Sequence, residues 1–387
     1  MQSFDFQHRT RFVFGAGKIA ELGSLAEQLG CRRAFLVCDS GVVAAGHFSK
    51  GVESLQKNGI ETASFHDFRE NPSNLDVDRG VIAAKDFCPD LLIGLGGGSS
   101  MDCAKGINFI YSCGGTIKDY WGVGKATHPM LPMIAVPTTA GTGSEAQSFA
   151  LISDSETHVK MACGDPKAAC RIALLDPELT VTQPHRVTAL TGIDALTHAL
   201  ETFVTKKRSP LSIVYSREAW RLLSQGFPQV LSEPNNVEAR GNVQWGACLA
   251  GLAIETSMLG VANATANPLT AKYGTTHGQA VGLMMPHVIR WNGEQFAEWY
   301  SLLWEDIPAR NASSSQNGSR GDAVDCLANW MEQTVAACGL KTRLESCGVQ
   351  REDLDLLTQD ALKQWTASFN PRAVTLPDAR ALYEAAW

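Results

Sequence analysis

The 387-residue sequence has no excess of positive charge. Lys and Arg number 33 against 40 Asp and Glu, so the formal net charge is −7. No extended run of Lys and Arg departs from this balance. Because a nucleic-acid partner needs a basic surface to neutralise phosphates, we expect none for this chain.

A secretion signal and long apolar runs are also missing. The N-terminal residues 1–10 are mostly polar and are too polar for a signal peptide. No window approaches about 18 unbroken apolar residues, the length that crosses a membrane. The composition, 44% hydrophobic and 19% charged, is that of an ordinary soluble protein. We therefore expect a cytoplasmic protein without a membrane partner.

Paired cysteine motifs are the third absence. The 11 cysteines are scattered and contain no Cys-x2-Cys pair. This pattern argues against a disulfide framework and against a zinc ribbon. It favours free thiols in a reducing compartment, in agreement with a cytoplasmic location.

Apolar segments of strand length alternate with helix-like segments in the first half of the chain. Strands are predicted at 11–14, 33–38, 62–65, 90–95 and 132–136, with helices at 19–29, 52–57 and 77–87. Unbroken apolar strands separated by helices predict a parallel sheet that is covered on both faces. Sheets of this kind bind ligands at the carboxyl ends of their strands.

The pattern changes after about residue 180, where strand-like runs stop. Long stretches rich in Ala, Leu and Met predict helices at 188–204, 210–232, 238–262, 278–290 and 322–340. Because the chain is also too long for a typical single core, we expect two domains. These are an α/β domain over 1–181 and an all-helical domain over 182–387, with an exposed, mobile loop at 311–321.

A glycine-rich loop, Gly96-Gly-Gly-Ser-Ser-Met-Asp102, follows the strand 90–95 and opens a helix. Glycines allow positive φ angles and a close approach of the backbone to a ligand. The amides and dipole at a helix N-terminus suit a pyrophosphate. The loop matches neither Gly-x-Gly-x2-Gly nor the P-loop of NTPases. A tight strand–helix turn is the structural alternative.

Two more loops carry polar groups at the same edge of the predicted sheet. Asp39 ends the strand 33–38, where a carboxylate can bind an adenosine ribose and repel a 2′-phosphate, which favours NAD over NADP. A helix N-cap is the alternative role for Asp39. The loop Pro137–Glu145 offers hydroxyls and glycines that can line a phosphate or a nicotinamide ribose. A polar loop capped by Ser144 is the alternative.

The predicted helix 192–201 carries Asp194 and His198 four residues apart. This spacing places both side chains on one helix face, one turn from each other. Such a pair is half of a metal site or an acid–base pair. Taken alone, a buried helix with a satisfied hydrogen-bonded pair is the more frequent explanation.

Five motifs together resemble the iron-containing (group III) alcohol dehydrogenase family. They are, in chain order, Gly96–Lys105, Pro137–Glu145, Asp176–Thr180, Gly192–Glu201 and Thr276–Gly278. The resemblance spans almost the whole chain. It implies a dehydroquinate synthase-like fold, in which an N-terminal dinucleotide-binding domain precedes an all-α metal and substrate domain. It also implies an active site in the cleft between the domains and a homodimer or larger homo-oligomer.

The resemblance implies NAD(H) as the cofactor. The residues that would contact it are Asp39 at the adenosine ribose, Gly97, Gly98 and Ser99 at the pyrophosphate, Asp102, Thr138, Thr139 and Lys160 at the ribose and nicotinamide end, and Asn71 and Leu179 nearby. For Lys160, a solvated side chain without a ligand is the alternative.

The family holds a divalent metal ion with one Asp and three His. Asp194, His198 and His277 match three of these positions, but Asn263 occupies the remaining one. A neutral amide oxygen is a weaker ligand than an imidazole for Fe(II) or Zn(II). We therefore expect Fe(II) or Zn(II) to bind less tightly here than at a site with three imidazoles. One turn later, Asn267 replaces another His that many members place near the nicotinamide.

The resemblance implies hydride transfer between NAD(H) and a small alcohol or its aldehyde or ketone, with the substrate oxygen on the metal ion. Asp194, His198 and His277 would be the catalytic residues. The maleylacetate reductases, relatives described as metal-independent, offer an alternative. Without a metal ion, His198 or His277 would be a general acid, with Asp194 orienting one of them.

Two further classes of protein receive less support from the sequence. A polyol dehydrogenase or dehydroquinate synthase type of enzyme needs a basic phosphate pocket, and Lys272 is the single basic residue near Asn263 and His277. The second class is a nucleotide-binding protein that has lost catalysis. The presence of Asp194, His198 and His277 together argues against such a loss.

Overall fold

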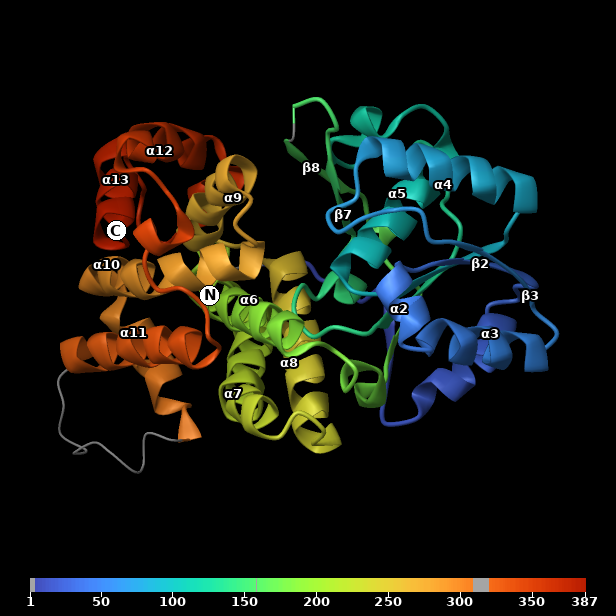
Figure 1. Cartoon of the computed structure of the whole chain (residues 1–387), viewed down its shortest axis with the longest axis horizontal. Helices are drawn as coiled ribbons and strands as arrows, with labels where there is room; N and C mark the ends of the chain where they lie inside the picture. The colour runs from blue at the N-terminus through green and yellow to red at the C-terminus, as the bar shows by residue number, and fades with distance from the viewer. Residues whose placement is uncertain (1–3, 158, 309–319) are drawn as a thin grey trace. The chain divides into compact units, whose positions relative to one another are not determined.

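The computed structural model describes residues 4–157, 159–308 and 320–387 (Figure 1). The chain forms two compact units, one of Gln7–Gln183 and one of Pro184–Trp387 together with the residues before Gln7. The predicted loop at 311–321 lies almost entirely outside the described residues.

A six-stranded parallel sheet forms the centre of the first unit, with strand order β1–β9–β6–β4–β2–β3. The strands are β1 (Arg11–Phe14), β2 (Arg33–Val37), β3 (Glu61–Phe65), β4 (Leu91–Gly96), β6 (Met133–Pro137) and β9 (Ile172–Leu175). The predicted parallel sheet is confirmed. The sequence does not predict β9, because a run of four apolar residues is too short to separate from a buried helix segment.

Helices cover both faces of this sheet. They are α1 (Leu22–Gln28), α2 (Ser40–Ala44), α3 (His47–Lys57), α4 (Asn74–Phe87) and α5 (Gly98–Cys113). Successive side chains of a strand point to opposite faces. Thus Ala34 and Leu36 of β2 pack in the core with α1 and α3, whereas Phe35 and Val37 pack in the core with α4 and α5. Burial on both faces explains why the strands have unbroken apolar sequences.

A second, three-stranded sheet adds to this unit and is not predicted by the sequence. It consists of β5 (Gly122–Val123), β7 (Phe149–Ser153) and β8 (Lys160–Gly164). Strand β8 runs parallel to β5 and antiparallel to β7. Short 3-10 helices complete the unit: η1 (Lys18–Glu21), η2 (Ile117–Tyr120), η3 (Ser144–Ala146), η4 (Pro166–Ala168) and η5 (Pro177–Thr180).

The second unit contains helices and no strand among its described residues. Its helices are α6 (His185–Val204), α7 (Pro210–Ser232), α8 (Val237–Thr256), α9 (Val261–Tyr273), α10 (His277–Glu305), α11 (Arg320–Ala337), α12 (Leu354–Lys363) and α13 (Leu376–Ala385), with 3-10 turns η7 (Glu345–Cys347), η8 (Arg351–Asp353) and η9 (Trp365–Phe369). Helix α6 packs against α7, α8 and α10 (Figure 1). Every residue from Gly192 to Val204 is buried, so α6 is the core helix of this unit.

The helix predicted at 238–262 is wrong, because the structure divides it into two. Helix α8 ends at Thr256 and α9 begins at Val261, with a bend of 103° between them. Ser257 leaves the helical conformation and donates its hydroxyl to the carbonyl of Ala253 over 2.5 Å. Ala- and Leu-rich flanks hide this break in the sequence. Among the described residues, no single helix is long and apolar enough to cross a membrane; the bent α8–α9 pair meets those criteria only together.

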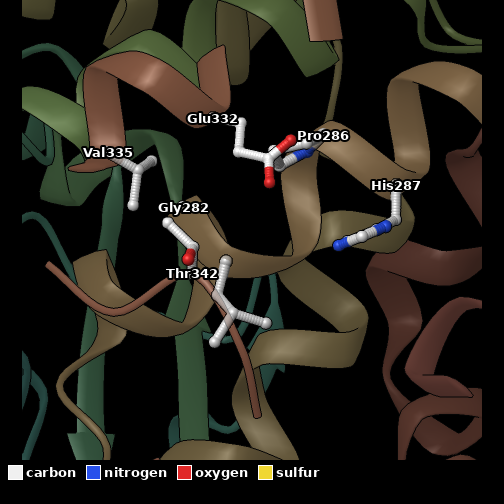
Figure 2. Close-up of a pocket in the computed structure, with 7 residues that line it drawn as sticks. Gly282, Pro286, His287, Glu332, Val335 and Thr342 are labelled. Carbon is white, nitrogen blue, oxygen red and sulfur yellow. The ribbon is translucent and has the colours of Figure 1, made fainter. Parts of the chain in front are cut away.

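A small pocket lies where α10 and α11 pack together (Figure 2). Its lining residues are Gly282, Leu283, Pro286, His287, Glu332, Val335 and Thr342. Burial and, to a smaller extent, the nearby Arg290 together lower the pKa of the His287 imidazole to about 4, against the raising effect of Glu332. None of the side chains predicted to bind a metal ion or a cofactor lines this pocket.

Candidate metal and cofactor sites

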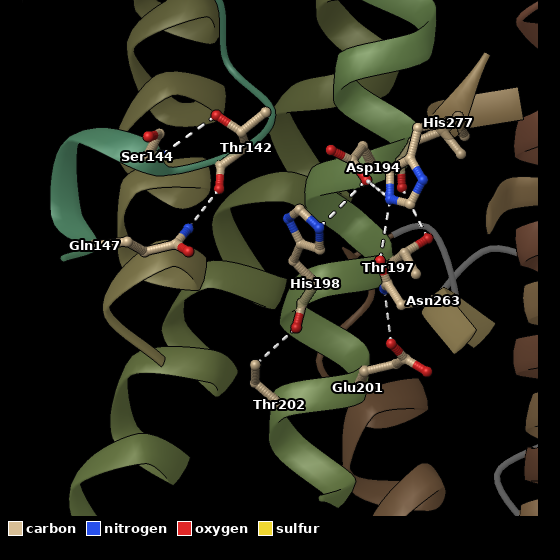
Figure 3. Close-up of polar contacts among 11 residues, drawn as sticks. Thr142, Ser144, Gln147, Asp194, Thr197, His198, Glu201, Thr202, Asn263 and His277 are labelled. Carbon is tan, nitrogen blue, oxygen red and sulfur yellow. Dashed lines mark hydrogen bonds and ion pairs between the residues drawn. The ribbon is translucent and has the colours of Figure 1, made fainter. Parts of the chain in front are cut away.

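Three side chains from two helices of the second unit converge on one point. Asp194 and His198 lie one turn apart on α6, and His277 is the first residue of α10. Both imidazoles point toward the carboxylate of Asp194 (Figure 3). Its Oδ1 atom is 3.2 Å from Nε2 of His198 and 3.7 Å from Nε2 of His277. The ligand atoms of all three residues lie within 4.8 Å of one another.

A glycine brings His277 close to α6. A Cβ atom added to Gly278 would lie 2.2 Å from the carbonyl oxygen of Leu190 in α6. Only glycine permits such a close approach between two backbones. The His-Gly sequence therefore provides the ligand and, in the next residue, the contact that positions it.

The three residues fit a divalent metal ion. Asp194 is 6% exposed and His198 is 5% exposed. Oδ1 of Asp194 accepts no hydrogen bond within the described part of the chain, and a buried carboxylate oxygen without a donor is costly unless a cation compensates it. Ligands of one ion at about 2.0–2.2 Å are roughly 3–3.5 Å apart, close to the separations of 3.2 Å and 3.7 Å between Oδ1 of Asp194 and the two imidazole nitrogens. One carboxylate and two imidazoles are a donor set for Fe(II) or Zn(II) with open positions.

Asn263 lies beside these three residues, in the first turn of α9, and is 4% exposed. Its Oδ1 atom is 3.0 Å from Nε2 of His277, and its Nδ2 group donates to Oε2 of Glu201 over 2.8 Å (Figure 3). Burial raises the pKa of the Glu201 carboxyl, while its hydrogen bonds lower it. The sequence predicts no role for Glu201. The available signal was its position three residues after His198, on a neighbouring face of α6.

Three polar side chains toward the end of α9, those of Asn267, Lys272 and Tyr273, are already paired. Asn267 donates to Oε1 of Gln364 over 3.0 Å. Lys272 forms an ion pair with Asp353 at 3.0 Å, and the hydroxyl of Tyr273 donates to the same carboxylate. Because Asp353 neutralises Lys272, this lysine is less suited to bind a phosphate group.

In the first unit, the glycine-rich loop has a backbone that side chains would disrupt. Gly96 at the end of β4 has a φ of 146°, and Gly98 begins α5. A Cβ atom on Gly98 would lie 2.7 Å from Cγ2 of Thr142, and one on Gly97 would lie 3.2 Å from Thr139. The glycines thus let the loop after β4 pack against the loop after β6. They leave the start of α5 half-exposed, as a phosphate site requires.

Three of the predicted cofactor residues form a connected group. Lys160 at the start of β8 donates to Oδ1 of Asn71 over 3.0 Å. The main-chain N–H of Asn71 donates to the hydroxyl of Ser99 over 3.1 Å. Asn71 has a φ of 56°, a left-handed conformation that Asn tolerates. The fold therefore assembles these residues from three distant segments, which the sequence alone does not indicate.

Asp102 and Lys105 connect α5 to the loop after β6. Asp102 accepts a hydrogen bond from the hydroxyl of Ser144 over 3.0 Å. Burial raises the pKa of the Asp102 carboxyl, against the lowering effect of nearby ammonium groups. The sequence predicts no role for Lys105, although its side chain is fully buried. It donates to three main-chain carbonyls, those of Ser144 at 2.6 Å, Gln147 at 2.8 Å and Phe149 at 2.9 Å.

Asp39 adopts the N-cap role that its position after a strand also allowed. Its Oδ1 atom accepts hydrogen bonds from the main-chain N–H groups of Gly41 at 2.8 Å and Val42 at 3.0 Å, which caps α2. The Oδ2 atom accepts a hydrogen bond from the hydroxyl of Ser100 at 3.3 Å. A capping carboxylate keeps further lone pairs for a ribose hydroxyl, so the contact of Asp39 with a ribose stays a prediction.

Thr138 and Leu179 are the least accessible of the predicted cofactor residues. Thr138 is 6% exposed, and its main-chain N–H donates to the carbonyl of Gly96 over 3.0 Å. Leu179 is 1% exposed and belongs to the core on the face of the sheet that α1 and α3 cover. Both contribute to packing, and their contacts with a cofactor stay predictions.

The fold and these side chains define a class of protein with a parallel-sheet unit, a glycine-rich loop between β4 and α5, and a helical unit in which one carboxylate and two imidazoles converge. Residues 9–177 match the family described as iron-containing alcohol dehydrogenase, and residues 188–387 match its C-terminal family, Fe-containing alcohol dehydrogenase. The chain is 32% identical over 370 residues to the NAD-dependent methanol dehydrogenase of Bacillus methanolicus, with 95% of each chain covered. It belongs to the iron-containing alcohol dehydrogenase family, and the predicted family is confirmed.

Solved structures confirm the predicted fold class as well. A 1,3-propanediol oxidoreductase is similar with a TM-score of 0.95 and 30% identity over 100% of both chains. Sulfoacetaldehyde reductase from Bifidobacterium kashiwanohense, solved in complex with NAD+, is similar with a TM-score of 0.87 and 26% identity over 100% of this chain and 99% of the relative's chain.

Proposed function

We propose that the chain is an NAD(H)-dependent oxidoreductase that interconverts a small alcohol and its aldehyde or ketone. The observation that carries this proposal is the convergence of Asp194, His198 and His277 within 4.8 Å in a member of the iron-containing alcohol dehydrogenase family. The similarity to an NAD-dependent methanol dehydrogenase supports the cofactor and the reaction class.

In the helical unit, Asp194, His198 and His277 would hold the divalent metal ion. A bound metal ion supplies Lewis-acid polarisation of an alcohol or carbonyl oxygen. The carboxylate of Asp194 would offset part of the charge of the ion. The imidazoles of His198 and His277 would hold it from two helices, because the close contact of Gly278 with Leu190 fixes α6 and α10 against each other.

In the sheet unit, the loop after β4 would bind the dinucleotide. NAD(H) accepts or donates the hydride. The half-exposed N-terminus of α5, with Gly97, Gly98 and Ser99, would receive the pyrophosphate through main-chain N–H groups. Asp39 would accept hydrogen bonds from the adenosine ribose. Asn71, Ser99 and Lys160 would orient the rest of the cofactor, and the hydrogen bonds that connect them support this role.

The test is removal and return of the metal ion. The protein is stripped with a chelator, and Fe(II), Zn(II) or Mn(II) is added back while NADH oxidation by a panel of short aldehydes is followed. We expect stripping to abolish turnover and add-back to restore it, with NADH preferred over NADPH. Preference for NADPH would contradict the role of Asp39. NADH binding without turnover of any aldehyde or alcohol would indicate a nucleotide-binding protein that has lost catalysis.

A metal-independent reductase on the same scaffold, similar to the maleylacetate reductases, is the second candidate. It is favoured by Asn263 in place of the usual imidazole and by the 3.2 Å separation between His198 and Asp194, at which the carboxylate can orient a general acid. Activity that survives stripping and ignores add-back would support this candidate over the metal-dependent one.

We further propose that residues 1–181 act as the dinucleotide domain and 182–387 as the metal and substrate domain, in a cytoplasmic homodimer or larger homo-oligomer. The net charge of −7 supports the absence of a nucleic-acid partner. All 11 cysteines are free, which supports a reducing compartment. The membership of a family of enzymes for alcohols and aldehydes supports a small-molecule substrate and no membrane partner.

A further inference from the structure

The side-chain amide of Asn263 has two chemically different ends, and only its oxygen can bind a metal ion. Its Nδ2 group donates to Oε2 of Glu201 over 2.8 Å, and its Oδ1 atom lies 3.0 Å from Nε2 of His277 (Figure 3). In the flipped orientation, Oδ1 would face a carboxylate oxygen, which accepts hydrogen bonds and repels another acceptor. Glu201 therefore selects the orientation in which the amide oxygen points toward Nε2 of His277, one of the three clustered side chains.

Glu201 is itself held in place. It is 2% exposed, and its Oε1 atom accepts a hydrogen bond from the main-chain N–H of Ala262 over 2.7 Å. Since Glu201 belongs to α6 and Ala262 to α9, this carboxylate joins the helix that carries Asp194 and His198 to the helix that carries Asn263. The orientation of the amide is thus fixed from the same helix that supplies two of the metal ligands.

We propose that Glu201 is a positioning residue that makes Asn263 a fourth, neutral oxygen ligand, and that this ligand narrows the preference of the site for Zn(II) over Mn(II). The proposal rests on the metal site of the proposed function. With Asp194, His198 and His277 alone, the site offers one oxygen and two nitrogens, and the amide adds a second oxygen. Imidazole suits Zn(II) and Fe(II), whereas carboxylate and carbonyl oxygens suit Mn(II).

The first experiment measures metal preference rather than turnover. The full-length protein is stripped of metal, and the dissociation constants of Zn(II) and Mn(II) are determined by competition with a chromophoric chelator. We expect Asn263→His to widen the preference for Zn(II) over Mn(II) by at least about tenfold, mostly through tighter Zn(II) binding. We expect Asn263→Leu, which keeps the branched shape of the side chain but has no atom that can bind a metal ion, to weaken Mn(II) binding by about tenfold.

The second experiment tests whether Glu201 acts through Asn263. Glu201→Gln keeps the size of the side chain and an acceptor for Ala262, but its amide can face Asn263 with either end. We expect Mn(II) binding to weaken by about tenfold in the native background and to show no further loss in the Asn263→Leu background. Asn267→Ala, on the same helix but paired with Gln364, is the matched control and should leave both dissociation constants within about twofold.

The outcomes separate this proposal from the proposed function. Unchanged Mn(II) and Zn(II) affinities in Asn263→Leu would overturn the role of Asn263 and leave a site of three ligands. A further loss from Glu201→Gln in the Asn263→Leu background would overturn the positioning role of Glu201. If Glu201→Gln does not fold, as judged by circular dichroism, the variants Asn263→His and Asn263→Leu still decide whether Asn263 is a metal ligand. Absence of any divalent-ion binding by the unaltered protein would contradict the metal-dependent form of the proposed function and would favour the metal-independent reductase.

Discussion

The predicted sites of the two units are built from different chemical groups, main-chain N–H groups in the first unit and side chains in the second. In Gln7–Gln183, the predicted cofactor site is built on main-chain N–H groups at the start of α5, and glycines such as Gly98 keep them accessible. In Pro184–Trp387, the predicted metal site is built on side chains, those of Asp194, His198 and His277. A site built on main-chain groups depends on glycines, because the absence of a Cβ atom keeps those groups accessible. A site built on side chains depends on the identity of each ligand residue. The substitution of a single ligand, Asn263, is therefore informative in the second unit.

The largest effect is expected from loss of an imidazole. His198→Ala removes one of three donors from a buried site, and we expect kcat/KM for aldehyde reduction to fall by about a thousandfold or more. The dissociation constant of NADH, measured by fluorescence titration, should stay within about twofold, because the cofactor site belongs to main-chain groups of the first unit.

Thr197→Val is the matched control for His198→Ala. Within the described residues, the hydroxyl of Thr197 donates to the carbonyl of Ile193 in its own helix, over 3.0 Å, and to no other group. This carbonyl keeps its helical hydrogen bond. We expect kcat/KM to stay within about threefold. If His198→Ala retains more than a tenth of the activity, the side-chain site of the second unit is not where the chemistry occurs.

The next largest effect is expected at Gly278, the glycine that brings His277 of the metal site close to α6. In Gly278→Ala, the new Cβ would lie 2.2 Å from the carbonyl oxygen of Leu190, so α10 must move away from α6 and carry His277 with it. We expect metal affinity to fall by about a hundredfold, because a ligand misplaced by 1 Å no longer completes the site.

Gly282→Ala, one turn further along α10, is the control for Gly278→Ala. Its Cβ would meet Cγ2 of Ile193 at 2.5 Å, which is a side-chain end rather than backbone. Repacking of Ile193 costs stability, and we expect metal affinity to stay within about threefold. Equal losses of metal affinity in both variants, measured by chelator competition, would show that general loosening of α10 matters and not the position of His277.

The extent of successful prediction also differs between the units. The sheet of the first unit can be predicted from the sequence because strands buried on both faces are unbroken apolar runs. Strand β5 cannot be predicted, since two residues carry no periodicity. The loop Gly96–Asp102 can be predicted because consecutive glycines indicate an unusual backbone conformation. The connection of Asn71 to Ser99 and Lys160 is not, because it depends on the positions of three loops that only the fold brings together.

In the second unit, local spacing identifies Asp194 and His198, because four residues are one helical turn. His277 and Asn263 lie far along the chain, and only resemblance to a family places them at the site. The apolar flanks hide the break before α9, and with it the orientation of Asn263. The contact of Glu201 with Asn263 could not be predicted, because it depends on the 103° bend between α8 and α9.

A third, smaller effect tests the main-chain site. In Gly98→Ala, the Cβ would lie 2.7 Å from Cγ2 of Thr142, so the two loops of the first unit must separate. We expect KM for NADH to rise by about tenfold, with metal affinity unchanged. Thr142→Ser removes the methyl group in the way, and the Gly98→Ala/Thr142→Ser variant should recover part of the loss. An unchanged KM in Gly98→Ala would contradict this difference between the two units. It would show that the cofactor site of the first unit does not require glycine at position 98.

The smallest effect is expected at His287, an imidazole of the second unit that lies outside the metal site. It concerns the pH dependence of folding rather than that of ligand binding. The folded-state pKa of His287 is about 4, below its usual value of 6.5. As the pH falls through this window, the unfolded chain binds the proton first, so the free energy of unfolding decreases from pH 6.5 toward pH 4. We expect His287→Gln to reduce the loss of stability between pH 7 and pH 5 by about 1 kcal/mol, allowing for the partial exposure of the ring. Denaturant unfolding measures this change, and the exposed His185→Gln is the control; equal pH profiles for the unaltered protein and His287→Gln would show that burial at the α10–α11 pocket does not set the charge of this imidazole.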